Sequence, residues 1–200
     1  MAITINGDGT LTGISVGGLP DGIVDTDMLA TDAVSAAKIG SLPAGSILQV
    51  VTSVTTTPTS ESISANSDGT TKVLSVSITP SSTSSKILVI YAVNVGGSYD
   101  YHSTILRRDT TKISIGTSTG NRAATSTYEA VPSTGAQTTA HTCMHLDSPS
   151  STSALDYNVI IHNSNNGTNT YYTNRTNSDQ DQATLRNRTA SNIIVMEVAG

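Results

Sequence analysis

The 200-residue chain has few of the residue types that usually fill a protein interior. It contains no Phe and no Trp, and its seven Tyr are the only aromatic residues. Charged residues make up 12% of the chain, about half of the globular average. In their place stand 28 Ser and 32 Thr. We therefore expect a core of Ile, Val, Leu and Ala in β-structure, with Thr on the outer faces of the strands.

Other absences exclude classes of protein. The single cysteine, Cys143, rules out an intramolecular disulfide. A net charge of −5 and a pI of about 5.1 argue against a sequence-independent nucleic-acid binder, which needs a basic face. No run approaches the roughly 18 apolar residues of a membrane span. Residues 1–10 have no secretory signal pattern, so we expect synthesis in a cytoplasm.

The sequence also lacks the motifs of common enzymes. No P-loop, Rossmann fingerprint, G-x-S-x-G or H-E-x-x-H pattern occurs. The few acidic residues after position 46 form no recognisable pair for glycoside cleavage. We therefore expect no enzymatic activity, no cofactor and no metal.

A short repeat lies between a Gly-rich start and a long β-patterned remainder. Residues 23–32 (IVDTDMLATD) and 33–42 (AVSAAKIGSL) follow each other with a period of ten. The repeat places apolar residues at regular steps of five: Val24, Leu29, Val34 and Ile39. This step matches neither helix nor strand, so we expect brief helical turns capped by Asp25 and Ser35. Such short pieces cannot be stable alone, which predicts a stalk of intertwined identical chains.

The residues before the repeat predict a hairpin, and those after it predict a β head. Residues 2–16 alternate around Asn-Gly and Asp-Gly turn signals. We divide the chain into an attachment segment and stalk at 1–45 and a head at 46–200. Nine strands are expected in the head, near 47–54, 72–79, 86–95, 103–107, 112–116, 139–146, 154–162, 170–173 and 193–198.

Short strands joined by polar turns predict an all-β head, an antiparallel sandwich that resembles a jelly roll. The nearly continuous apolar run at 86–95 predicts a central strand buried on both faces. Two polar stretches, 117–138 and 174–190, lack a strand pattern. Long loops of this kind commonly carry recognition residues.

Two clusters could in principle hold a metal. His141, Cys143 and His145 alternate along one expected strand, so they share a face, as zinc ligands would. No fourth ligand is evident, and packing of this face is the favoured alternative, with Met144 and Leu146 as possible buried partners. The segment 179–181 (Asp-Gln-Asp) has too few oxygen ligands for calcium, so we expect a solvated loop tip.

Several stretches in series resemble fibre proteins of tailed bacteriophages, especially environmental and cyanobacterial ones. They are AITINGDGTLTGISVGGLPDG, the repeat TDAVSAAKIG, the linker GSLPAGSILQVV, and the head segments KILVIYAVNVG, ILRRDTTKISIG, HLDSPSSTSALDYNVII and NIIVMEVAG. The resemblance covers nearly the whole chain. It implies a homotrimeric virion fibre with a stalk and a C-terminal β head. The chain departs from long fibres in having two repeats, so we expect a short fibre, or a decoration protein, attached through residues 1–20.

The resemblance implies a virion protein, made in the host cytoplasm, that attaches the particle to a bacterial surface polysaccharide. The alternative is a capsid head fibre or a decoration protein without receptor activity. Expected partners are two further copies of the chain, other virion proteins at residues 1–20, and a host glycan. No contact with nucleic acid and no membrane insertion are expected.

We expect the receptor to contact two polar loops, residues 99–102 and 174–188, rather than the strand faces, because these loops concentrate groups that stack on sugars and bond their hydroxyls. The residues named for this role are Tyr99, Asp100, Tyr101, His102, Asn174, Arg175, Asn177, Asp179, Asp181 and Arg188.

Overall fold

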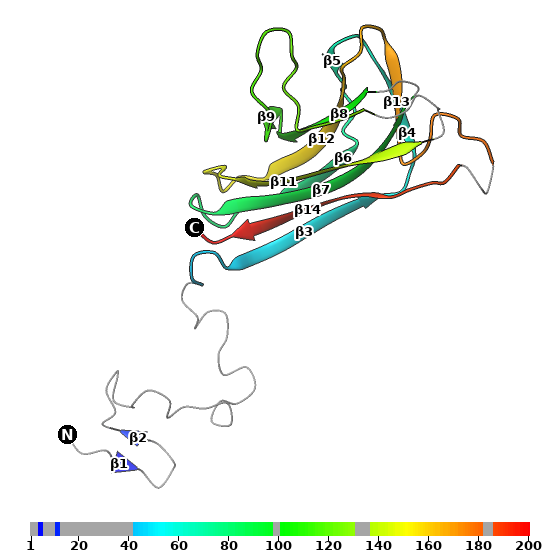
Figure 1. The fold of residues 1–200 in the computed structure, drawn as a ribbon. Helices are drawn as coiled ribbons and strands as arrows, with labels where there is room; N and C mark the ends of the chain where they lie inside the picture. Colours follow the sequence, from blue (N-terminus) through cyan, green and yellow to red (C-terminus); the bar gives the residue numbers. More distant parts are fainter. Residues whose placement is uncertain (1–3, 6–10, 13–41, 98–100, 131–136, 182–185) are drawn as a thin grey trace. The chain divides into compact units, whose positions relative to one another are not determined.

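The computed structural model describes residues 4–5, 11–12, 42–97, 101–130, 137–181 and 186–200 (Figure 1). The chain forms two units, Met1–Leu42 and Pro43–Gly200. In the first unit β1 (Thr4–Ile5) pairs antiparallel with β2 (Leu11–Thr12), on either side of the Asn-Gly and Asp-Gly signals. The four stalk residues Val24, Leu29, Val34 and Ile39 lie outside the described residues.

The second unit is an all-β, sandwich-like head of two antiparallel sheets, and none of its described residues is helical. The first sheet is organised around its longest strand, β7 (Lys86–Gly97). One edge of β7 pairs with β11 (Thr138–Asp147), and the other pairs with β14 (Ser191–Val198) and then β13 (Asn169–Thr173). Two strands complete this sheet: β3 (Ile47–Thr55) beside β14, and β4 (Thr59–Ile63) beside β13.

The second sheet is organised around β12 (Leu155–Asn163). One edge of β12 pairs with β8 (Tyr101–Arg108), and the other pairs with β6 (Leu74–Ile78) and β5 (Ser67–Asp68). Beyond β8 lie two short strands, β9 (Thr111–Ile113) and β10 (Thr127–Ala130). All nine strands expected from the sequence are present. The strands β4, β5 and β10 were not expected, because their polar sequences TSESI, SD and TYEA carry little apolar periodicity.

The core lies between the two sheets, and alternate residues of each strand build it. In β7 the inward residues Ile87, Val89, Val93 and Val95 are fully buried, whereas the outward residues between them are only partly buried. The expectation that this strand is buried on both faces is therefore wrong for the single chain. The outer face of its sheet stays accessible.

Three tyrosines replace the missing Phe and Trp in the core. Tyr91, Tyr157 and Tyr171 are fully buried, although the sequence predicted a core of aliphatic residues alone. Each hydroxyl has a polar partner: the side chains of Thr104, Asp147 and Asn163, at 2.8, 2.7 and 2.8 Å. These bonds satisfy the buried hydroxyls and allow the large rings to fill the interior.

In β11 the side chains alternate between the two faces as expected, but Met144 and Leu146 lie on the exposed face rather than in the interior. His141, Cys143 and His145 share the inner face, and His141 is buried against Thr127, its Nδ1 lying 2.8 Å from that hydroxyl. Met144 and Leu146, possible buried partners in the sequence analysis, instead point outward and are 70% and 49% exposed. Strand geometry requires this, since alternate residues face opposite sides of a sheet.

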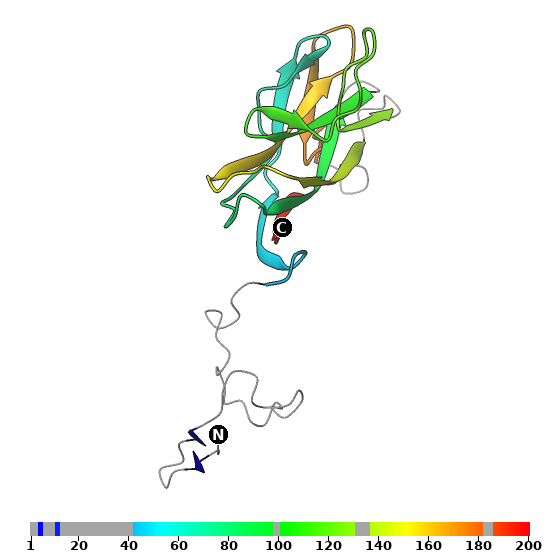
Figure 2. The same cartoon turned by 90° about the vertical axis from the view of Figure 1, so that its left-hand side faces the viewer.

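The head has two distinct ends. At one end, which we call the basal end, the chain enters β3 beside the C-terminus: Gly45 N–H donates to Ala199 (2.7 Å) and Ala199 N–H donates to Ser46 (2.8 Å) (Figure 2). Leu155, where β12 begins, pairs with Ile78 near this end. From there β12 runs about 24 Å to His162, at about 3.4 Å per residue, so His162 and β5 mark the distal end.

Candidate functional site

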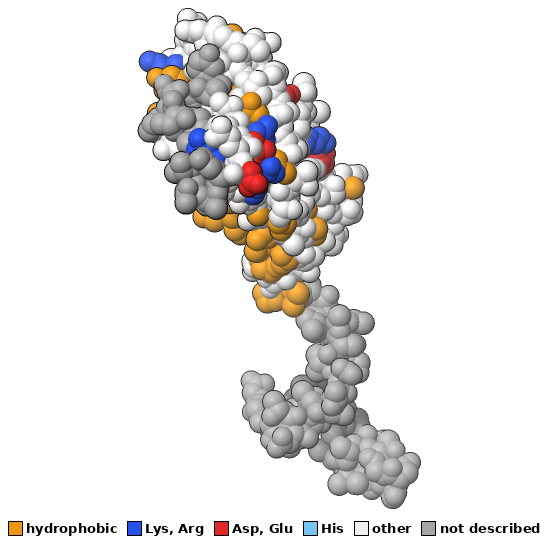
Figure 3. Space-filling model, turned by 90° about the vertical axis from the view of Figure 1, so that its right-hand side faces the viewer, with side chains coloured by type: hydrophobic (Ala, Val, Ile, Leu, Met, Phe, Trp, Pro, Cys, Tyr) orange, Lys and Arg blue, Asp and Glu red, His pale blue; other side chains and the backbone are white. Residues whose placement is uncertain are grey.

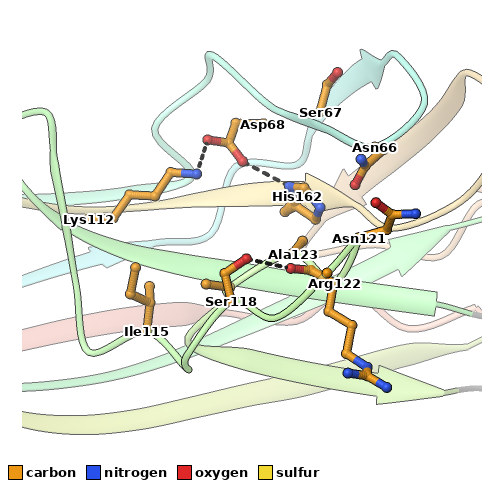
Figure 4. Close-up of a pocket in the computed structure, with 12 residues that line it drawn as sticks. Asn66, Ser67, Asp68, Lys112, Ile115, Ser118, Asn121, Arg122, Ala123 and His162 are labelled. Atoms are coloured by element: carbon orange, nitrogen blue, oxygen red, sulfur yellow. Dashed lines mark hydrogen bonds and ion pairs between the residues drawn. The ribbon is translucent and has the colours of Figure 1, made fainter.

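A hollow of about 720 Å³ lies at the distal end of the described head. The tip of β5, the end of β12 and the 114–124 loop that follows β9 supply its walls (Figure 4). Its polar lining includes Asn66, Asp68, Lys112, Asn121 and His162. Volumes of this size are typical of small-ligand sites, which range over about 300–1,000 Å³.

Asp68 is the centre of a charged group in this hollow. Its carboxylate lies 2.6 Å from Lys112 Nζ and 2.8 Å from His162 Nδ1. Burial by itself would raise the pKa of Asp68, but the hydrogen bonds and charges of Lys112 and His162 outweigh it and hold the pKa below its usual value. The second ring nitrogen of His162, Nε2, is buried and has no hydrogen-bond partner among the described residues.

A carboxylate from the neighbouring sheet holds β5 in place. Glu61 on β4 accepts hydrogen bonds from Thr70 N–H (2.6 Å), the Thr70 hydroxyl (2.9 Å) and Thr71 N–H (3.2 Å). Burial favours a raised pKa for Glu61, but these hydrogen bonds lower it overall. Gly69 passes so close that a Cβ there would lie 2.6 Å from Glu61 Oε2 and 2.9 Å from Ile63 Cδ1. The glycine is required because β4 and β5 approach each other here.

A buried amide fixes the floor beside the hollow. Asn163 is fully buried, and its Nδ2 donates to Ile63 (2.8 Å) and Gly167 (2.8 Å) carbonyls. Its Oδ1 accepts from Asn165 N–H (2.9 Å) and from the Tyr171 hydroxyl (2.8 Å). One side chain therefore connects β4, β12, the turn after β12, and β13, which makes the distal end a rigid base for its loops.

The 114–124 loop folds back on itself to form the outer wall. Gly116 N–H donates to Thr125 (3.2 Å), and the Ser118 hydroxyl donates to the Arg122 carbonyl (2.9 Å). At the tip, Gly120 has a φ of 62°, a left-handed conformation that glycine adopts without strain. Figure 4 shows the Arg122 side chain directed away from Asp68. No described residue forms an ion pair with the Arg122 guanidinium.

A second hollow of about 410 Å³ lies on the other side of Arg122. It shares Asn66, Asn121, Arg122 and Ala123 with the first, and adds Thr125, Tyr128 and Ser164. The Tyr128 ring stacks on Tyr101 with centroids 5.9 Å apart and planes 15° apart, and both rings are exposed. Together the two hollows form one polar site, which we call the distal site. Arg122, which has no ion-pair partner among the described residues, lines both hollows, and the aromatic pair lies at one side.

The chemistry of the distal site suits binding. Asp68 is the only acidic residue among the described residues that line it, whereas glycoside hydrolysis uses a pair of carboxyl groups. Amides, hydroxyls and a guanidinium offer many donors and acceptors, and an exposed tyrosine offers a flat apolar surface. Nowhere in the described part of the chain do three or more His, Cys, Asp or Glu side chains gather as metal ligands would.

Of the first predicted receptor loop, one residue lies at the distal site. Tyr101 borders the second hollow through its stack on Tyr128. His102 is 1% exposed and packs edge-on against Tyr171, with centroids 5.8 Å apart, so its side chain does not face solvent. Tyr99 and Asp100 lie outside the described residues.

The second predicted loop is a separate feature, since none of its described residues lines either hollow. Asn174 is fully buried and anchors the loop: its Nδ2 donates to the Thr55 carbonyl (2.9 Å) and its Oδ1 accepts from the Ser191 hydroxyl (2.5 Å). Its φ of 61° is a turn conformation that Asn tolerates. Asn174 is therefore a structural residue of the single chain.

The remaining residues of that loop largely pair with one another. Arg175 stacks over the Tyr172 ring at 4.0 Å, and its Nη1 lies 3.4 Å from the Asn177 carbonyl. Asp179 accepts from Arg188 at 2.7 Å and lies 3.8 Å from Arg175. Asp181 is exposed. A receptor role for these residues stays a prediction, and Arg175 and Arg188 already pair with Asp179 within the loop.

Most of the distal site was not identified from the sequence. The stretch 117–138 was recognised as a polar loop, but its residues Asn121, Arg122 and Tyr128 were not chosen. Asp68, Lys112 and His162 are far apart in sequence and meet only because β5, β9 and β12 share a sheet. Neither models of known protein families nor curated protein sequences match this chain. No helix among the described residues could cross a membrane.

Proposed function

We propose that this chain is a homotrimeric virion fibre protein whose head attaches the particle to a saccharide on the bacterial surface, and that the distal site holds the sugar. The sequence resemblance supports the fibre assignment. The observation that carries the proposal is the position of the distal site: it lies at the end of the head opposite the point where the chain enters from its N-terminal segment.

That position matches the geometry of attachment. A fibre fixed through its N-terminal segment presents the far end of its head to the target. The basal end is occupied by the chain entry and the C-terminus, which bond to each other. The polar distal site and its exposed Tyr101–Tyr128 pair are then the first surface of the head that meets a cell.

The lining supports recognition of sugar rather than its cleavage. Sugar hydroxyls need paired donors and acceptors, which Asn66, Asn121, Arg122 and Ser164 supply. The Tyr128 ring offers a face for the C–H side of a sugar ring. Among the described lining residues the one carboxylate is Asp68, which is ionised and bound to Lys112, so it is poorly suited to act as a general acid.

Binding to an array of bacterial surface polysaccharides tests the proposal. We expect the full-length protein to select one group of glycans and Arg122→Ala to bind them about tenfold or more weakly, since hydrogen bonds to charged groups contribute about 1.5–3 kcal/mol. The control is Lys72→Ala, an exposed cation that lines neither hollow and belongs to neither predicted receptor loop. Both variants should melt close to the wild-type temperature, as surface changes usually do.

The same experiment separates the two candidate functions. If no polysaccharide binds, or if Arg122→Ala and Tyr128→Ala bind as the wild type does, the distal site is not the receptor site. A decoration protein without receptor activity then becomes the better hypothesis.

A further inference from the structure

The outer face of the first sheet carries rows of apolar side chains. The strand register places four of them side by side across the sheet: Val50, Met196, Leu88 and Leu146. The next outward row is Thr52, Ile194, Ile90 and Met144. We call these two rows the apolar face. Val50 is 57% exposed, and Figure 3 shows hydrophobic side chains gathered low on the head.

The composition of this face is unusual for a surface exposed to water. An antiparallel sheet with one solvated face normally alternates apolar and polar residues. Here the central parts of β7 and β14, residues 87–93 and 193–196, are apolar on both faces, and neither row contains a charged side chain. Strands of this kind are typical of sheets that are covered on both sides. The sequence therefore fits a head whose outer face is buried in the assembled protein.

The size of the face fits a contact between proteins. Four strands about 4.8 Å apart, with two outward positions about 6.8 Å apart on each, give the two rows a flat area of roughly 260 Å². A stable interface buries about 800 Å² on each partner. Ile47 and Leu48 are also exposed and extend the apolar surface towards the basal end. The apolar face can therefore supply part of the area that a stable assembly needs.

The continuation towards the basal end identifies the occupant. The chain enters the basal end directly after the repeat, residues 23–42. The apolar column of this repeat predicts association of identical chains. Association there would hold the basal ends of the heads close together at a high effective concentration. We infer that the apolar face packs against the same face of two sister copies around a common axis, an inference that rests on the proposed trimer.

Oxidation of Met144 by hydrogen peroxide tests this contact in the full-length protein. Met144 is 70% exposed in the single chain, so an uncovered side chain should react almost as fast as in the urea-unfolded protein. We expect oxidation in the native assembly to be about tenfold or more slower, measured by peptide mass spectrometry. Light scattering of the same sample should give the mass of a trimer.

Two variants assign the protection to the apolar face. Val50→Asp introduces a charge into the first row, and we expect it to restore fast oxidation of Met144 and to weaken the trimer. Thr111→Asp introduces the same charge at an exposed position of the other sheet and should change neither. Circular dichroism checks that both variants are folded.

Three outcomes would overturn the inference. A trimer in which Met144 reacts as fast as in urea would show that the trimer is held elsewhere, leaving the proposed fibre intact. A monomer with protected Met144 would show that the chain's own N-terminal segment covers the face. A Val50→Asp trimer with protection unchanged would also exclude the contact. Polysaccharide binding, measured on the same samples, tests the proposed function separately.

Discussion

Glu197 is a buried carboxylate that no described cation neutralises. It accepts hydrogen bonds from Gln49 Nε2 (2.6 Å), Ser85 Oγ (2.7 Å), and the N–H and hydroxyl of Ser81 (both 2.7 Å). Burial raises the pKa of Glu197, but these bonds outweigh it and lower the pKa to about 2. This residue therefore ties β14 to β3 and to the turn before β7.

Removing that carboxylate should be costly. Glu197→Ala leaves four donors without their acceptor, so we expect the free energy of unfolding to fall by about 3 kcal/mol. Glu129→Ala, at an exposed position of β10, should change it by no more than about 0.5 kcal/mol. Urea unfolding measures both. Equal stability of the two variants would mean that the network around Glu197 contributes little.

His141 should make stability depend on pH in a defined window. Burial, together with the nearby His102, lowers the pKa of His141 from 6.5 to about 4. The unfolded chain therefore binds a proton there that the folded chain does not, and stability falls as the pH drops from 6.5 to 4. The full effect is about 3 kcal/mol, at about 1.4 kcal/mol per pKa unit.

The check is the stability of His141→Gln over the same pH range. The variant cannot take up that proton, so its loss of stability between pH 6.5 and 4 should be smaller by up to about 1.4 kcal/mol per pH unit. The carboxylates with lowered pKa values, Glu61, Asp68, Asp156 and Glu197, also make stability fall as the pH drops, but mainly below the unfolded Glu pKa of 4.5, and they are present in both proteins. An unchanged slope in the variant would contradict the assignment to His141.

At the scale of elements, side chains of β4 lie very close to the backbone of Gly69, the residue that follows β5. Gly69→Ala places a methyl group against Glu61 and Ile63, so we expect a loss of about 1–3 kcal/mol from overpacking. Displacement of β5 should also move Asp68 and weaken polysaccharide binding. Gly116→Ala is the control, since a Cβ there has no atom within 4 Å. The measurements are the melting temperature and the polysaccharide affinity of both variants. Equal values for Gly69→Ala and Gly116→Ala would contradict the prediction.

The strands differ in how far the sequence predicts them. Long apolar strands such as β7 and β12 are evident from their pattern, because burial selects alternate or continuous apolar residues. The strand β5 has two polar residues, and it exists because β12 pairs with it and Glu61 holds the residues that follow it. The distal site depends on these short elements, so its residues could not be grouped from the sequence alone.

At the scale of the molecule, the sequence did not predict that one sheet has an exposed apolar outer face. The run at 86–95 was interpreted as buried on both sides, and the single chain covers only one of them. If the apolar face is an interface, that interpretation describes the assembly rather than the isolated chain. Periodicity reports that a residue is buried, and it does not distinguish burial within one chain from burial between chains.

The proposed arrangement also predicts how strongly the protein holds a surface. A trimer carries three copies of the distal site, all on the side of the heads away from the stalk, so several sites can engage one polysaccharide-coated surface. Linked binding of this kind strengthens attachment by about 10²–10⁴ without any new contact.

Leu29→Asp, in the apolar column of the repeat, should release monomers whose distal site is unaltered. We expect wild type and variant to bind a short soluble fragment of the selected polysaccharide with equal affinity, measured by calorimetry. On the immobilised polysaccharide the variant should dissociate at least about a hundredfold faster. Equal dissociation of a trimeric wild type and a monomeric variant would mean that the three sites cannot reach one surface together.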